Sequence, residues 1–137
     1  MIISTFFGCG PDLPEGWEDA VPIADLVQQE CAGNPYEDYD ERVEVDFTAP
    51  VEVVYREAHF RCEQDVEAFA RIDGTALGVL VQPVDLHPNV VPDCDCLYDV
   101  TMHVAEFDGV PSEVELWRRW DALNEPNDPV FIGTAAP

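Results

Sequence analysis

Cysteine and histidine side chains are the residues of this sequence best suited to chemistry, and they gather in two short motifs. One motif is Cys94-Asp95-Cys96 and the other runs from His59 to Cys62. Thiolate sulfur and imidazole nitrogen are ligands that zinc prefers, and four of them complete its tetrahedral site. The sequence therefore allows one zinc or copper site built from His59, Cys62, Cys94 and Cys96.

The same cysteines can instead form disulfide bonds. The chain has five cysteines, and setting Cys9 aside leaves the even set Cys31, Cys62, Cys94 and Cys96. Four cysteines in an exported domain are typical of two disulfides, which can be connected in three ways. A bond between Cys94 and Cys96 would close a very small ring, so each is expected to reach Cys31 or Cys62. We predict two disulfides and no cofactor, with the metal site as the alternative.

Tryptophan and arginine occur together near the end of the chain, in the run from Trp117 to Trp120. Alternate residues of a strand share one face, so Trp117 and Arg119 are expected to lie side by side. An exposed tryptophan beside an arginine can stack on a sugar ring or anchor a protein partner. Trp117 and Arg119 are therefore candidates for ligand binding, and packing against aromatic neighbours is the alternative.

No local motif pairs a nucleophile with a base. The sequence contains no Gly-x-Ser-x-Gly elbow, no His-Glu-x-x-His pair and no glycine-rich phosphate loop. His103 stands on the polar side of an alternating run, where a solvated or hydrogen-bonded histidine is expected. We predict that the protein is not an enzyme.

The charge of the chain is strongly acidic, with a formal net charge of −23 from 29 acidic residues and no lysine. Binding of nucleic acid needs a basic patch, and this surface would repel phosphates. An anionic bilayer would be repelled as well, so membrane attachment must be covalent or apolar. Hydrophobic residues still make up 47% of the chain, as in folded proteins. The charge favours a soluble monomer that binds no nucleic acid.

The apolar pattern predicts one helix followed by strands. Apolar residues have helical spacing over 22–31, with Pro22 suited to the first turn and Gly33 to the end. Apolar and polar residues then alternate, most clearly over 97–107. Asp73-Gly74 between two such runs predicts a hairpin. We predict a mainly β fold, an antiparallel β-sandwich of the immunoglobulin-like type with about six to seven strands and one short N-terminal helix.

The first residues form a short apolar run that ends at Phe6-Phe7-Gly8-Cys9. This run is too short to span a bilayer. It resembles the end of a bacterial lipoprotein signal peptide, in which a small residue precedes the cysteine that receives the lipid. The resemblance implies lipidation of Cys9, with 1–9 as a signal remnant, 10–20 as a tether and 21–137 as one β-domain. A first strand is the alternative for 1–9.

The whole layout is similar to that of small lipoproteins of uncharacterised function from Gram-negative bacteria. An acidic tether, a helix and a disulfide-bearing β-domain entered by Cys94-Asp95-Cys96-Leu97-Tyr98 carry this similarity. It implies an extracytoplasmic protein, anchored by its lipid in the outer membrane or at the cell surface. We predict a non-catalytic binding or structural module with a protein or glycan partner. The alternatives are an extracytoplasmic zinc or copper protein and a carbohydrate-binding module.

Overall fold

The computed structural model describes residues 12–137, so Cys9 and the signal remnant or strand predicted at 1–9 lie outside the described residues. The described part contains nine strands and no helix. It accordingly has no helical segment of the length and apolarity that crossing a membrane requires. The strands are β1 (Val21–Pro22), β2 (Asp25–Gln28), β3 (Arg42–Asp46), β4 (Val51–Arg61), β5 (Val66–Asp73), β6 (Ala76–Pro83), β7 (Asp95–Val104), β8 (Glu113–Arg118) and β9 (Val130–Ala135).

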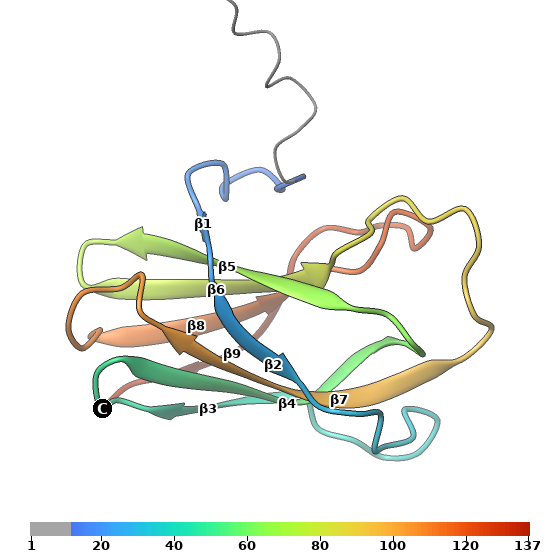
Figure 1. The fold of residues 1–137 in the computed structure, drawn as a ribbon, viewed down its shortest axis with the longest axis horizontal. Coiled ribbons are helices and arrows are strands. Elements are labelled where there is room, and N and C mark those ends of the chain that lie inside the picture. The colour runs from blue at the N-terminus through green and yellow to red at the C-terminus, as the bar shows by residue number, and fades with distance from the viewer. Residues whose placement is uncertain (1–11) are drawn as a thin grey trace, which may run out of the picture.

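The strands form two sheets that pack against each other (Figure 1). One sheet has the order β1-β5-β6-β8-β9 and the other has the order β2-β7-β4-β3. The alternation predicted over 97–107 lies mostly in β7, where Val100, Met102 and Val104 are fully buried and the residues between them are not. Apolar side chains from both sheets join in one core. The prediction of a mainly β fold in two layers is confirmed.

The hairpin predicted at Asp73-Gly74 is confirmed, with the loop one residue further along. β5 and β6 pair antiparallel as far as Asp73 and Ala76, so Gly74 and Thr75 form the loop. Gly74 has a φ of 62°, in the left-handed region that glycine enters without steric cost. Glycine at the first of two loop positions is typical of a type II′ turn.

The helix predicted over 22–31 is wrong, because this segment contains β1 and β2. β1 pairs with β5 of one sheet and β2 pairs with β7 of the other, so the chain changes sheets between them (Figure 1). Ile23 and Leu26 both pack into the core, one on each side of this change. The crossing between sheets therefore produces a spacing of apolar residues that imitates a helix.

The predicted antiparallel pairing holds for the described strands with one exception, the pair β6 and β8. β6 and β8 are parallel, with Ala76 opposite Glu113 at one end and Val81 opposite Arg118 at the other. Parallel neighbours need a long crossover connection, which is usually a helix. Here β7 of the opposite sheet lies in that connection. A strand can thus serve as the crossover where the fold has a second sheet.

A β-bulge in β4 decides which side chains face outward near the end of that strand. The pairing with β7 shifts between Tyr55 and Ala58, and Glu57 has a φ of 54°. The carboxylate of Asp99 accepts a hydrogen bond from the backbone N–H of Glu57 at 3.1 Å and so holds the bulge. Tyr55 and Ala58 both face the core. The bulge reverses the alternation of faces, and His59 consequently points away from the core.

Two residues of the predicted tether at 10–20, Asp12 and Trp17, contact the domain. Trp17 is 3% exposed. Its ring covers Gly78 of β6, where an added Cβ would come within 3.2 Å of the indole. The guanidinium carbon of Arg71 lies 3.9 Å from the centroid of the same ring. The folded domain therefore includes the segment from Asp12, which covers the outer face of the five-stranded sheet.

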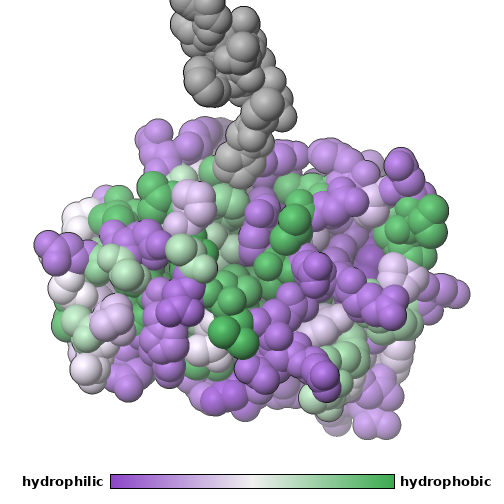
Figure 2. Space-filling model, viewed as in Figure 1, coloured by the Kyte–Doolittle hydropathy of each residue, from purple (hydrophilic) through white to green (hydrophobic). Residues whose placement is uncertain are grey.

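The arginines are engaged within the domain. Each of the six lies within 4.0 Å of a carboxylate oxygen. Figure 2 shows a mostly hydrophilic face with apolar patches between the polar side chains. Because the sequence has no lysine, carboxylates are the charges that residues 12–137 chiefly present to a partner.

Candidate functional site

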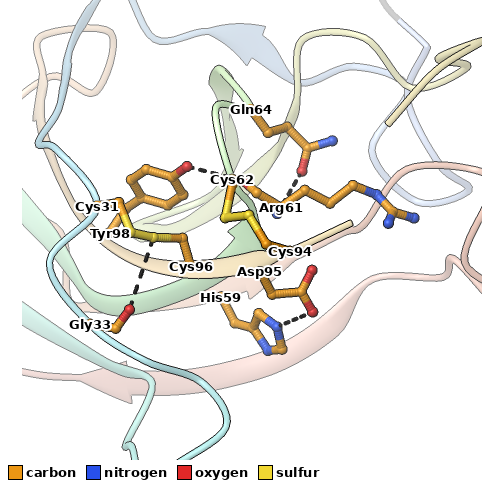
Figure 3. The surroundings of a disulfide bond; sticks show 10 residues. All are labelled: Cys31, Gly33, His59, Arg61, Cys62, Gln64, Cys94, Asp95, Cys96 and Tyr98. Carbon is orange, nitrogen blue, oxygen red and sulfur yellow. Dashed lines mark hydrogen bonds and ion pairs between the residues drawn. A yellow bond between two sulfur atoms is a disulfide. The ribbon is translucent and has the colours of Figure 1, made fainter. Parts of the chain in front are cut away.

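Two disulfides hold one end of the domain together (Figure 3). Cys31 is bonded to Cys96, and Cys62 is bonded to Cys94. The Cα atoms of the two pairs are 5.7 and 5.6 Å apart, which is usual for disulfides. The prediction of two disulfides is confirmed, and of the three open connectivities the structure has this one. Such bonds form and persist in oxidising compartments.

The disulfides remove the thiolates on which the predicted metal site depends. Cys62, Cys94 and Cys96 are oxidised, and the thiolate, not the disulfide sulfur, is the metal ligand. His59 lies at the same end of the domain (Figure 3), but both of its ring nitrogens have hydrogen-bond partners. Within residues 12–137, no group of three or more His, Cys, Asp or Glu side chains is arranged to hold a metal ion.

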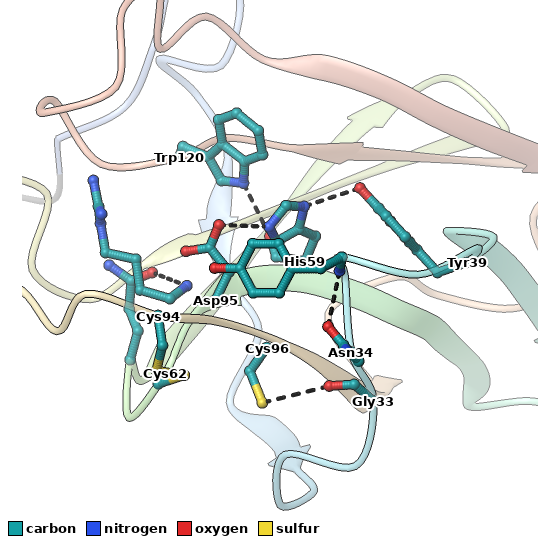
Figure 4. A network of polar contacts seen from close by, with 12 residues as sticks. Gly33, Asn34, Tyr39, His59, Cys62, Cys94, Asp95, Cys96 and Trp120 are labelled. Carbon is teal, nitrogen blue, oxygen red and sulfur yellow. Dashed lines mark hydrogen bonds and ion pairs between the residues drawn. A yellow bond between two sulfur atoms is a disulfide. The ribbon is translucent and has the colours of Figure 1, made fainter.

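His59 is the centre of a polar network that joins three segments of the chain (Figure 4). Its Nε2 lies 3.0 Å from Oδ2 of Asp95, the first residue of β7. Its Nδ1 lies 3.0 Å from the hydroxyl of Tyr39, in the loop before β3. An ionised carboxylate can only accept, so Nε2 donates to Asp95. Both ring nitrogens of His59 are therefore engaged inside the protein.

The backbone of His59 is hydrogen bonded to side chains as well. β3 pairs with β4 only as far as Arg56, so the edge of β4 has no neighbouring strand at His59. The Glu41 carboxylate accepts from the His59 N–H at 3.1 Å, and Nε1 of Trp120 donates to the His59 carbonyl at 2.9 Å. These side chains satisfy the backbone groups that a further strand would otherwise pair.

A buried ion pair lies beside this edge. Nη2 of Arg118 donates to Oε2 of Glu41 at 3.1 Å, and the two side chains are 8% and 13% exposed. The Tyr55 hydroxyl also donates to Glu41, and the Arg118 guanidinium lies 4.0 Å from the centroid of Trp120. Burial alone would lower the pKa of Arg118, but the charge of Glu41 raises it above the usual value. Burial and the charge of Glu41 raise the pKa of Tyr55 well above its usual range, so its phenol stays neutral.

The network around His59 leaves little open space. Nδ1 of His59 is hydrogen bonded to the Tyr39 hydroxyl. Burial and the charge of Glu41 raise the pKa of Tyr39, so its oxygen is a phenol and not a nucleophilic phenolate. The cavity beside His59, Asp95 and Trp120 has a volume of about 60 Å³, far below that of a usual substrate pocket. The arrangement instead fixes the loop before β3 onto the sheets.

The predicted ligand-binding residues Trp117 and Arg119 are engaged by the N-terminal segment. Trp117 packs edge to face with Trp17 and Phe131, at interplanar angles of 71° and 66°. Arg119 is 11% exposed, and its Nη1 donates to the carbonyl oxygen of Asp12 at 3.0 Å. The side chains thus fasten residues 12–17 to the sheet, and their rings form no flat exposed platform.

A second buried ion pair lies at the end of β4, between Arg61 and Asp121. Nε of Arg61 donates to Oδ2 of Asp121 at 2.7 Å, and the Asp121 side chain is 1% exposed. Gln64 donates to the same oxygen and the Leu123 N–H donates to the other, each at 3.0 Å. Burial alone would raise the pKa of Asp121, but the hydrogen bonds from Arg61, Gln64 and Leu123 outweigh it and lower this pKa below its usual value.

We expect Asp121→Asn to lower the free energy of unfolding by about 2 kcal/mol near neutral pH, since hydrogen bonds to a charged group are worth roughly that much. The lowered pKa of Asp121 means that its ionised form stabilises the wild type above about pH 4, and that this contribution is lost as the pH falls further. The difference between the two proteins should therefore narrow below about pH 4. Urea unfolding across that range measures it, and a difference independent of pH would contradict this role.

The residues that form the polar network around His59 could not be identified from the sequence. Tyr39 and Glu41 lie in an acidic loop with no apolar periodicity, and Arg118 was grouped with its tryptophan neighbours. The one local signal is the tyrosine itself, because two tyrosines, Tyr36 and Tyr39, stand in a segment that is otherwise polar. Tyr39 does contact the body of the domain, whereas Tyr36 is 73% exposed, so the signal picks out one of the two.

Comparison with known proteins finds no matching family model, no matching curated protein and no matching solved structure.

Proposed function

We propose that this chain is a non-catalytic binding module of the Gram-negative cell envelope, outside the cytoplasm and held to the membrane by a lipid on Cys9. The observation that carries the proposal is the pair of disulfides. They account for four of the five cysteines, and Cys9 is the fifth. Disulfides persist in oxidising compartments, and Gly8-Cys9 resembles the junction at which bacterial lipoproteins are lipidated.

The polar network supports the proposed binding role. Both ring nitrogens of His59 are hydrogen bonded within the domain, and Tyr39 is held as a neutral phenol. The same contacts fix loops from both sheets in one arrangement, and fixed loops lose less conformational freedom when a partner binds. The surface charge favours a cationic partner over nucleic acid.

The two alternatives have less support. A zinc or copper protein would need thiolates where the domain has disulfides. A carbohydrate-binding module would need a flat aromatic surface, whereas Trp117 and Phe131 stand edge to face. We also propose that the two sheets form an immunoglobulin-like sandwich. The change of sheets between β1 and β2 and the shared core support this assignment.

The docking of Asp12 makes the proposed anchor short. The carbonyl oxygen of Asp12 accepts hydrogen bonds from Gln82 and Arg119, each at 3.0 Å. Its carboxylate lies 3.0 Å from Nε2 of His87. The chain can extend by at most about 10 Å between Cys9 and Asp12. Under the proposal, the outer face of the five-stranded sheet therefore lies close to the bilayer.

Membrane fractionation tests the proposed anchor. The chain would be produced in a Gram-negative host with a lysine-containing apolar leader placed before Met1, so that the Gly8-Cys9 junction itself is the cleavage site tested. We expect the protein to partition into the detergent phase and to incorporate labelled palmitate, since lipid-anchored proteins do both. The matched Cys9→Ser protein should do neither. Equal partition of the two proteins would contradict the proposal.

A further inference from the structure

A groove with an apolar wall and a charged wall lies between the turn after β4 and the long segment that joins β6 to β7. Its volume is about 270 Å³. Figure 1 shows this segment, in yellow, curving around the right-hand end of the molecule beside the green β4–β5 turn. The apolar lining consists of Val84, Pro88, Val90, Val91 and Pro92, and we call it the valine groove.

The apolar side chains of the groove are unusually open to solvent. Val84 is 56% exposed and Val90 is 88% exposed. A single exposed valine needs no explanation, but a contiguous apolar surface with polar borders is typical of a contact site. Figure 2 shows an apolar patch at the same end of the molecule, bordered by hydrophilic surface.

The charged residues around the valine groove are of one sign. Glu63, Asp65 and Asp85 line it and are exposed. Arg61 also lines it, but the buried Asp121 neutralises that arginine. Opposite charge favours encounter and selects the partner, while like charge opposes it. The rim therefore favours a cationic ligand and disfavours an acidic one.

The walls of the groove are held in place before any ligand binds. The Cys62–Cys94 disulfide joins them, and the Val84 N–H donates to the carbonyl oxygen of Asp65 at 2.9 Å. Leu86, near the start of the segment between β6 and β7, is 5% exposed and anchors that segment to the domain. A site that is already ordered loses little conformational entropy on binding, so its contacts contribute more of their energy to affinity.

We propose that the valine groove binds an extended basic segment of a partner protein, in which lysine or arginine alternates with aliphatic residues. In an extended chain, alternate side chains point to opposite sides. The aliphatic set would fill the groove over Val84 and Val90, and the long, flexible basic side chains would bend back from the other side of the segment to the three carboxylates of the rim. The inference rests on the proposed binding role and names its partner by chemistry.

The test is a titration of the full chain carrying Cys9→Ser, prepared under oxidising conditions and observed by nitrogen-15 NMR. The probe is the peptide Lys-Val-Lys-Val-Lys with blocked ends, and the control peptides replace its lysines by glutamate or its valines by glycine. We expect saturable shifts centred on Val84 and Val90 for the probe alone. Raising NaCl from about 50 to about 300 mM should weaken binding, because exposed charges are screened.

Two matched variants distinguish binding at the valine groove from attraction of the peptide to the acidic surface as a whole. One carries Glu63→Gln, Asp65→Asn and Asp85→Asn, and the other carries Glu37→Gln, Asp38→Asn and Asp40→Asn in the loop before β3. The rim variant should bind the probe about tenfold more weakly, and the loop variant should differ from the parent by less than about twofold. Thermal melts verify that both are folded.

Several results would overturn the inference. These are wild-type affinity in the rim variant, equal weakening in the loop variant, equal binding of the glutamate or glycine peptide, and absence of shifts near Val84. None of them depends on lipid, because the tested protein has serine at position 9. The proposed envelope anchor is tested separately by fractionation, so the two can fail independently.

Discussion

Replacing both Cys31 and Cys96 by serine is expected to lower the free energy of unfolding by about 4 kcal/mol. The bond closes a loop with a sequence separation of 65, and restriction of the unfolded chain by a loop of that size corresponds to about 4.3 kcal/mol. Small domains have a total stability of roughly 5–15 kcal/mol. The variant should therefore unfold at a much lower urea concentration than the wild type under non-reducing conditions.

The second disulfide provides the matched control. Cys62 and Cys94 are separated by 32 residues, and the same relation gives about 3.7 kcal/mol for their bond. Replacing both by serine should thus cost slightly less than replacing Cys31 and Cys96. If either double variant unfolded at the wild-type urea midpoint, the corresponding bond would not stabilise the domain and this pairing would be contradicted.

Breaking the buried ion pair between Glu41 and Arg118 is expected to cost about 3 kcal/mol. Arg118→Met keeps much of the side-chain volume but leaves the Glu41 carboxylate without its charge partner, at a site where only 13% of the side chain is exposed. The contact with the face of Trp120 is lost as well. Urea unfolding compares this variant with the wild type.

A double-mutant cycle isolates the interaction energy between Glu41 and Arg118 from the contacts that each makes with other residues. Glu41→Gln should also destabilise the domain, since it weakens the hydrogen bonds from Tyr55, His59 and Arg118. The double variant should be more stable than the sum of the two losses implies, because it buries no unpaired charge. Strictly additive losses would mean that the two side chains do not interact, and would contradict this account of the network.

Strands with a local alternation of apolar and polar residues could be predicted. β7 alternates between core and solvent from Tyr98 to Val104, so its sequence alone reveals both the strand and its inward face. The hairpin at Gly74 was predicted for a similar reason, since few residues other than glycine suit its φ. The disulfides followed from the cysteine count, while their connectivity depended on how the sheets pack.

Errors arose where the chain passes between sheets or where distant residues meet. Ile23 and Leu26 imitate a helix only because the chain crosses from one sheet to the other between them. The bulge at Glu57 is held by Asp99, which lies 42 residues away in the sequence. The network is likewise non-local, since Glu41 and Arg118 are 77 residues apart. No window of sequence contains both partners, so periodicity could not reveal these contacts.

Intact-mass measurement of the membrane-extracted protein tests lipidation of Cys9 and both disulfides in one experiment. The protein would come from the Gram-negative host, with the leader placed before Met1, and would be alkylated without reduction. The account predicts a chain that begins at Cys9, carries lipid, and lacks the four hydrogens that two disulfides remove. A chain that retains the residues before Cys9 without lipid, or one whose other cysteines are all alkylated, would contradict it.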